Sequence, residues 1–98
     1  METEYEHVVY ILECKDGTLY TGYTNNLFRR LAMHESGKGA KYTRGRGPFL
    51  LKYYEAFQTK EEAMKQEYYI KQLKRSEKIN RIRAFQKEED RCANTKKL

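Results

Sequence analysis

The pattern of the sequence predicts a single α+β domain with a small, three-stranded, mainly antiparallel sheet flanked by helices. Two strand-like runs joined by an Asp-Gly turn open the chain, which is typical of a β-hairpin. Two long helical segments close it without a strand between them. At 98 residues the chain fits one domain. We therefore expect the order strand, strand, helix, strand, helix, helix in one domain over 1–98, with a core at about 5–82 and a flexible tail at 88–98.

The predicted hairpin leaves two registers open. Its parts are a strand at 8–14 (VVYILEC), a turn at 15–17 (KDG) and a strand at 18–24 (TLYTGYT). A two-residue turn pairs Tyr10 with Tyr23 and directs Tyr20 to the opposite face. A three-residue turn, with Gly17 left-handed, pairs Tyr10 with Gly22 and places Tyr10 and Tyr20 on one face. The sequence does not choose between these registers, and tyrosines in strands more often serve packing than catalysis.

Capping signals and periodicity predict the remaining elements in order. A helix over about 26–36 begins at Asn25 or Asn26 and ends at Gly37. Its apolar stripe consists of Leu27, Phe28, Leu31 and Ala32. A glycine-rich basic loop at 37–48 (GKGAKYTRGRGP) then leads to a third strand at 49–57 (FLLKYYEAF). A second helix begins after Thr59, with Glu62 placed for a capping box, and ends near residue 74; a third runs from about 76 to 87.

One carboxylate interrupts the apolar pattern of the second helix. Ala63, Ile70 and Leu73 mark its inner face, and Glu67 falls on the same stripe. A charge in such a place needs a partner or a metal. Glu67 is therefore either a boundary residue, paired with Lys71 or extended outward to solvent, or a ligand for a hard divalent cation such as Mg²⁺, which uses few carboxylates and keeps several waters.

The net charge of +6 favours a polyanionic partner, of which nucleic acid is the commonest. The basic loop carries candidate phosphate contacts at Lys38, Lys41, Arg44 and Arg46. A mobile, solvated connection is the competing interpretation of the same loop. Arg30 and His34 lie one helical turn apart, so both can address a single phosphate, although either residue alone serves solubility as readily.

Other features bear on location. An apolar run of 18 or more residues is absent from the sequence, so we expect no membrane span. The first residues, METEYEHVVY, lack the layout of a secretory signal. The two cysteines, Cys14 and Cys92, are far apart and show no metal-binding spacing, and Cys14 is expected to be buried in a strand. These features favour the reducing cytoplasm.

An ordered set of residues carries a resemblance to a known family. Val8-Val9-Tyr10 and Tyr20-Thr21-Gly22 stand as relaxed forms of two half-motifs, and Arg30, His34 and Glu67 follow at suitable spacing. This set resembles the GIY-YIG nuclease superfamily over about residues 5–82. The compact form is most similar to the small stand-alone, single-domain GIY-YIG proteins of bacteria.

The resemblance implies a GIY-YIG-like fold and a metal-dependent endonuclease that hydrolyses DNA phosphodiester bonds, with structure-selective cleavage in DNA repair or recombination as one role. It implies one Mg²⁺ or Mn²⁺ ion held by Glu67, transition-state stabilisation by Arg30, and either Tyr10 or Tyr20 as the residue that orients water, with His34 as relay. DNA would be the substrate. The protein would bind it as a monomer, as a homodimer or together with a second protein that supplies specificity. The alternatives are a non-catalytic nucleic-acid-binding module and a protein-interaction adaptor.

Overall fold

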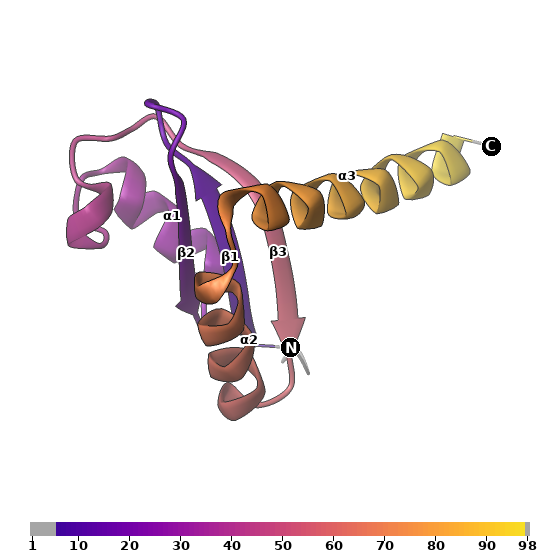
Figure 1. Ribbon diagram of the computed structural model, residues 1–98, viewed down its shortest axis with the longest axis horizontal. Coiled ribbons are helices and arrows are strands. Elements are labelled where there is room, and N and C mark those ends of the chain that lie inside the picture. The colour runs from indigo at the N-terminus through magenta and orange to yellow at the C-terminus, as the bar shows by residue number, and fades with distance from the viewer. Residues whose placement is uncertain (1–5, 98) are drawn as a thin grey trace.

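The computed structural model describes residues 6–97, with side chains over residues 6–88. The observed order of elements, strand, strand, helix, strand, helix, helix, confirms the predicted α+β class (Figure 1). The elements are β1 (His7–Glu13), β2 (Leu19–Thr24), α1 (Leu27–Glu35), the 3-10 turn η1 (Lys41–Thr43), β3 (Leu50–Phe57), α2 (Lys60–Gln72) and α3 (Arg75–Lys97). No helix in this described part of the chain is both long and apolar enough to cross a bilayer.

The three-residue hairpin turn sets the register of the sheet. β1 lies in the middle and pairs antiparallel with β2 on one side and β3 on the other. Tyr10 lies opposite Gly22, and Leu12 lies opposite Tyr20. Gly17 adopts a φ of 85°, which a glycine tolerates without steric cost, and its N–H donates to the Cys14 carbonyl at 2.9 Å. The longer of the two turns is therefore the one formed, so Tyr10 and Tyr20 share a face.

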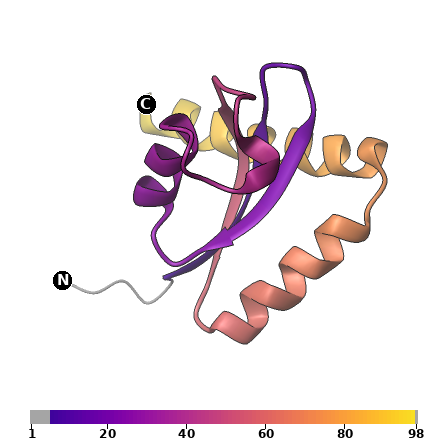
Figure 2. The ribbon, with the colours of Figure 1, turned by 90° about the vertical axis from the view of Figure 1, so that its left-hand side faces the viewer.

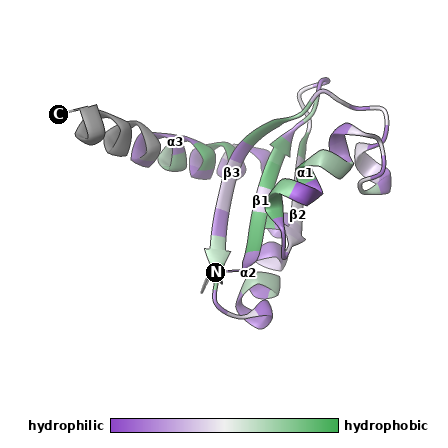
Figure 3. Ribbon diagram, turned by 180° about the vertical axis from the view of Figure 1, so that it is seen from behind, coloured by the Kyte–Doolittle hydropathy of each residue, from purple (hydrophilic) through white to green (hydrophobic). Residues whose placement is uncertain are grey.

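The two faces of the sheet differ in what covers them. α2 packs against β1 and β2, and α3 packs against β3, all on one face, while α1 lies on the other (Figures 1 and 2). β1 is hydrophobic along its length because both of its faces are covered (Figure 3). The main core, on the side of α2 and α3, comprises Val9, Ile11, Tyr53, Ala63, Ile70 and Ile82. Each large apolar side chain buried there contributes about 1.5–3 kcal/mol to folding.

The helix ends follow local chemistry. The Asn26 side chain accepts a hydrogen bond from the Arg29 N–H at 3.1 Å and caps α1. α1 ends with Gly37 at a φ of 83°, where the Lys38 N–H donates to the Met33 carbonyl at 2.8 Å in a Schellman arrangement. Thr59 and Glu62 form the predicted capping box of α2.

Two expectations about the helices were wrong. Two members of the predicted apolar stripe are not buried, because the Phe28 side chain is 86% exposed and Ala32 is exposed as well. α1 instead turns His34 inward, the one residue of this helix that is buried. α3 continues to Lys97 and does not end near Lys87, since no glycine or proline interrupts this segment rich in Lys, Glu, Gln and Arg. The domain limits and the flexibility of residues 88–98 stay predictions.

Candidate active site

The two predicted tyrosines lie together on the α1 side of the sheet. Their ring centroids are 6.3 Å apart. Gly22 lies beside both, and a Cβ at this position would be 2.6 Å from the Tyr10 hydroxyl oxygen and 2.9 Å from a Tyr20 ring carbon. Such distances are shorter than real Cβ contacts, so the close approach of the two phenols requires a residue without a side chain.

His34 joins this pair from α1. Its imidazole is 2% exposed, and its Nε2 is hydrogen-bonded to the Tyr10 hydroxyl at 2.8 Å. Its Nδ1 is hydrogen-bonded to the Thr43 hydroxyl at 2.9 Å. The ring also meets the edge of Tyr20 at a centroid distance of 5.5 Å. The structure therefore brings Tyr10, Tyr20 and His34 into direct contact.

Burial controls the protonation of this cluster. Desolvation raises the pKa of Tyr10 to about 12, although the hydrogen-bonded Arg30 guanidinium opposes the shift. Desolvation also lowers the pKa of His34 below 6.5, and the positive charge of Arg30 adds to this effect. At neutral pH the pair therefore consists of a protonated phenol and a neutral imidazole.

Arg30 lies against the tyrosines and keeps one donor unused. Hydrogen bonding to the Tyr10 phenol raises the pKa of Arg30, so its guanidinium is always charged. Among the described residues, its buried Nε–H has no hydrogen-bond partner. Arg30 also lines a cavity of about 170 Å³ at the start of α1, together with Asn26 and Arg29. A buried donor without a partner is costly, and a phosphate oxygen would satisfy it.

Glu67 lies on α2, which covers the face of the sheet opposite to Tyr10, Tyr20 and His34. Its side chain is 14% exposed, and its Oε2 lies 3.1 Å from Lys71 Nζ, as one of the two predictions for this residue required. Its negative charge adds to the burial that raises the pKa values of Tyr10 and Tyr23, which lie on opposite faces of the sheet. Among the influences on the pKa of Tyr10, the charge of Glu67 is the smallest. Among the described residues, the carboxylate makes no hydrogen bond or ion pair with Tyr10, His34 or Arg30.

The surroundings of Glu67 could hold a metal ion only if most of its ligands are water or substrate, because few protein ligands lie nearby. The described residues contain no group of three or more His, Cys, Asp or Glu side chains able to hold an ion. A single carboxylate still fits Mg²⁺ or Mn²⁺, which retains waters and gains its remaining ligands from a phosphate. The ion would have to displace Lys71 from its pairing with Glu67.

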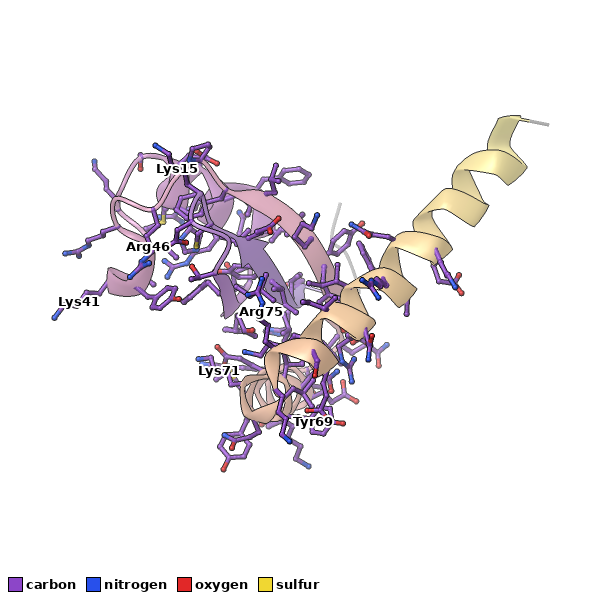
Figure 4. The ribbon with its side chains drawn as sticks, turned by 45° about the horizontal axis from the view of Figure 1, so that its top comes forward. Lys15, Lys41, Arg46, Tyr69, Lys71 and Arg75 are labelled. Atoms are coloured by element: carbon purple, nitrogen blue, oxygen red, sulfur yellow. The ribbon has the colours of Figure 1, made fainter. Side chains whose placement is uncertain are left out.

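The basic loop is held against the hairpin. Three of its predicted contact residues, Lys38, Lys41 and Arg44, are exposed and have no ion-pair partner in the described part of the chain. Arg46 differs, because its guanidinium pairs with Asp16 at 2.6 Å and lies over the Tyr42 ring at 4.6 Å from the centroid. Figure 4 shows Lys41 and Arg46 on this loop, with Lys71 below them on α2. Arg46 thus anchors the loop and presents a stacked cation.

Two residues of this loop contact the site but were not predicted from the sequence as site residues. Tyr42 is 44% exposed and stacks on Tyr20 at 5.9 Å between centroids. Its signal was an aromatic residue among basic ones, which is typical of nucleic-acid contacts. Thr43 is 1% exposed and hydrogen-bonded to His34, and no pattern in the sequence points to it.

The comparison with protein families decides the identity of the fold. The model of the GIY-YIG catalytic domain matches residues 6–80. The chain belongs to the GIY-YIG family. This GIY-YIG chain is similar to a UPF0213 protein of Oceanobacillus iheyensis, with 63% identity over 84 residues that cover 86% of this chain and 96% of the relative. It is also similar to a UPF0213 protein of Clostridium perfringens, with 60% identity over 76% of this chain and 80% of the relative.

Solved structures agree with this GIY-YIG assignment. The solution NMR structure of a UPF0213 protein from Bacillus halodurans superimposes with a TM-score of 0.54 at 59% identity, over 80% of this chain and 83% of that one. An NMR structure of a protein from E. faecalis superimposes with a TM-score of 0.59 at 42% identity, over 88% of this chain and 92% of that one. The chain thus shares its fold with solved structures of similar sequence and belongs to a nuclease family.

Proposed function

We propose that this GIY-YIG protein is a divalent-metal-dependent endonuclease that hydrolyses DNA phosphodiester bonds in the cytoplasm, with structure-selective cleavage in repair or recombination as its role. One observation carries the proposal: the buried hydrogen bond from Tyr10 to His34 lies beside an Arg30 guanidinium whose Nε–H lacks a partner. A proton relay next to an unsatisfied phosphate-binding donor is what hydrolysis of a phosphodiester needs.

Tyr10 and His34 supply the proton acceptor for the attacking water. With a pKa of about 12, Tyr10 is almost never a phenolate at neutral pH, so it cannot act as a free base. It can accept the water proton if its own proton passes to Nε2 of His34, 2.8 Å away, in the same step. The water oxygen then bonds to phosphorus, and the P–O bond to the leaving oxygen breaks. We therefore assign Tyr10 as the base and Tyr20, which is partly exposed, as the phenol that orients the water.

Arg30 and Glu67 address the charge of the phosphate. Arg30 donates to the phosphate oxygens, and its donors strengthen as negative charge develops in the transition state. Glu67 would hold the Mg²⁺ or Mn²⁺ ion, which supplies charge neutralisation and assistance to the leaving group when bound. The remaining work of the site, which is to position water, exclude bulk solvent and move the proton, belongs to Tyr10, Tyr20 and His34.

The nucleic acid would lie along the basic loop next to these tyrosines. Lys38, Lys41 and Arg44 are exposed and unpaired among the described residues, so they can neutralise phosphates without breaking internal ion pairs. Tyr42 offers an exposed aromatic edge at the same place. Because a domain of this size has few further contacts to offer, substrate choice would depend on this loop, on a homodimer or on a partner protein.

A cleavage screen tests the proposal. Wild-type protein is incubated with branched, nicked and single-stranded DNA and with RNA, in Mg²⁺, in Mn²⁺ and in chelator. Arg30→Lys, Glu67→Gln and Tyr10→Phe should each reduce cleavage by about 10²-fold or more, because each removes a group that acts in the transition state. Unchanged cleavage in all three variants would refute the assignment.

Matched controls separate the site from the rest of the chain. Arg83→Lys makes the same change as Arg30→Lys at an exposed arginine of α3, away from the site, and Tyr68→Phe repeats the Tyr10→Phe change at a tyrosine that is 69% exposed on α2. Both controls should cleave like the wild type. A control that loses as much activity as its partner would show that the loss reflects stability or general charge.

The ion pair at Glu67 favours one alternative, a non-catalytic nucleic-acid-binding module. Lys71 already neutralises the carboxylate at 3.1 Å, and the described residues bring no second acidic ligand to it. Such a module would bind DNA with affinity that falls steeply as salt rises. It would show no cleavage in either metal, and Glu67→Gln would leave its binding unchanged.

A further inference from the structure

Thr43 is the buried residue of the basic loop, and its hydroxyl meets two partners. Its Oγ1 lies 2.9 Å from His34 Nδ1 and 2.9 Å from the carbonyl oxygen of Ala40. A threonine hydroxyl carries one proton and two acceptor lone pairs. The atom that receives this single proton therefore fixes the direction of both hydrogen bonds.

The directions follow from the chemistry of each partner. The Ala40 carbonyl can only accept, so the Thr43 hydroxyl donates to it. Thr43 Oγ1 must then accept from His34, which places the ring proton on Nδ1. A neutral imidazole has one N–H, so Nε2 is an acceptor and the Tyr10 hydroxyl donates to it. The opposite tautomer would set two acceptors against the one proton of Thr43.

An imidazolium would also satisfy Thr43, but its surroundings disfavour it. The titratable groups that face the ring are Tyr10 from β1, Tyr20 from β2, and Arg30 and Glu35 from α1. Burial and the charge of Arg30 lower the pKa of His34, whereas Glu35 opposes them weakly. The ring is therefore neutral near pH 7.

We propose that Thr43 is a positioning residue that holds His34 in the Nδ1–H tautomer and so keeps Nε2 free to receive the Tyr10 proton. Its consequence for catalysis rests on the proposed nuclease function, but the tautomer itself does not. The packing around the ring is tight, because a Cβ at Gly39 would collide with His34 Nδ1. Thr43 shares the turn η1 with Lys41.

Nitrogen NMR of the histidine rings tests the tautomer without reference to activity. The chain has two histidines, and a His7→Gln variant identifies the signals of His34 by removing the other set. At pH 7.5 the wild type should show a protonated Nδ1 and an unprotonated Nε2. Thr43→Val, which keeps the shape and removes the acceptor, should populate the Nε2–H form, and Thr43→Ser should restore the wild-type pattern. An Nε2–H or doubly protonated ring in the wild type would overturn the proposal, as would an unchanged pattern in Thr43→Val.

Kinetics test the consequence. Thr43→Val should lower kcat by about 10–100-fold, the range that follows loss of a partner orienting a functional histidine, with KM little changed. Thr43→Ser should recover most of the rate. Equal rates in wild type and Thr43→Val would overturn the positioning role. If the wild type cleaves no substrate but shows the expected tautomer, the role of Thr43 in holding His34 stands and the nuclease function fails.

Discussion

Replacing Gly22 with alanine would test the geometry of the two tyrosines most directly. The new Cβ would lie 2.6 Å from the Tyr10 hydroxyl oxygen and 2.9 Å from a Tyr20 ring carbon. Ordinary contact begins at 3.4 Å, so a gap of about 0.8 Å must open between the Cβ and the phenol of Tyr10. Tyr10 cannot yield this distance freely, because it is fully buried and its hydroxyl is bound to His34 at 2.8 Å.

These contacts allow an estimate of how much Gly22→Ala lowers the free energy of unfolding. Overpacking of a buried site costs about 1–3 kcal/mol. The alanine returns about 0.4–1 kcal/mol by restricting the unfolded chain. The midpoints of these two ranges give a net loss of about 1.3 kcal/mol, which corresponds to a fall in Tm of about 5–10 °C for a domain of this size. Cleavage should also fall, because a phenol displaced by about 0.8 Å no longer holds its 2.8 Å hydrogen bond to His34 in the present geometry.

Thermal unfolding followed by circular dichroism gives the stability, and single-turnover cleavage below Tm gives the rate. Gly47→Ala is the matched control, since its nearest neighbour is a Phe49 ring carbon at 3.3 Å, which needs a far smaller displacement. The reasoning is refuted if Gly22→Ala keeps both the Tm and the cleavage rate of the wild type. A normal Tm with lost cleavage would show that Tyr10 moves at little cost.

The remaining predictions concern capping, pH and metal binding. Thr59→Ala should lower the free energy of unfolding by about 0.5–2 kcal/mol in urea titrations, because it removes the cap of α2 and frees Glu62 from the box. The folded pKa of His34 lies below its ordinary value of 6.5, so the stability that it contributes is present above about pH 6.5 and is lost as pH falls toward the folded pKa. His34→Gln should therefore flatten the dependence of unfolding free energy on pH between about 7.5 and 5; an unchanged slope would contradict this assignment. Lys71→Gln should tighten Mg²⁺ binding in calorimetry, because Lys71 competes for Glu67 at 3.1 Å, and binding that is unaffected would remove Glu67 as the ligand.

The sequence predicted the elements and their order well because each had a local signal. The capping box at Thr59 and the Asn26 cap of α1 depend on side chains within three residues of the helix start. The register of the hairpin was open because a turn of two or three residues satisfies the same pattern. In the longer turn that forms, the Lys15 N–H donates to the Arg46 carbonyl at 2.8 Å, a contact between distant parts of the chain that the local pattern does not reveal.

The sequence named candidate residues for the site but did not predict their hydrogen bonds or the burial of their side chains. Spacing brought Arg30 and His34 to one side of α1, but the inward rotation that buries His34 and exposes Phe28 depends on contacts with the sheet. The role of Thr43 depends on the direction of a hydroxyl proton, which sequence patterns do not record. The sequence left Glu67 with two interpretations. The structure contains its ion pair with Lys71, and its role as a metal ligand stays a prediction.

The odd length of the hairpin turn also bears on how this chain can change over time. Exchanging a side chain within 15–17 leaves the count of the turn intact, so Tyr20 keeps its place beside Tyr10. Deleting or inserting one codon there would reverse the facing of every later residue of β2 and send Tyr20 toward the core under α2. Insertion or deletion of one residue in this turn should therefore be tolerated far less often than substitution. A library of single-codon insertions, deletions and substitutions at residues 15–17, selected for function, would measure the two tolerances.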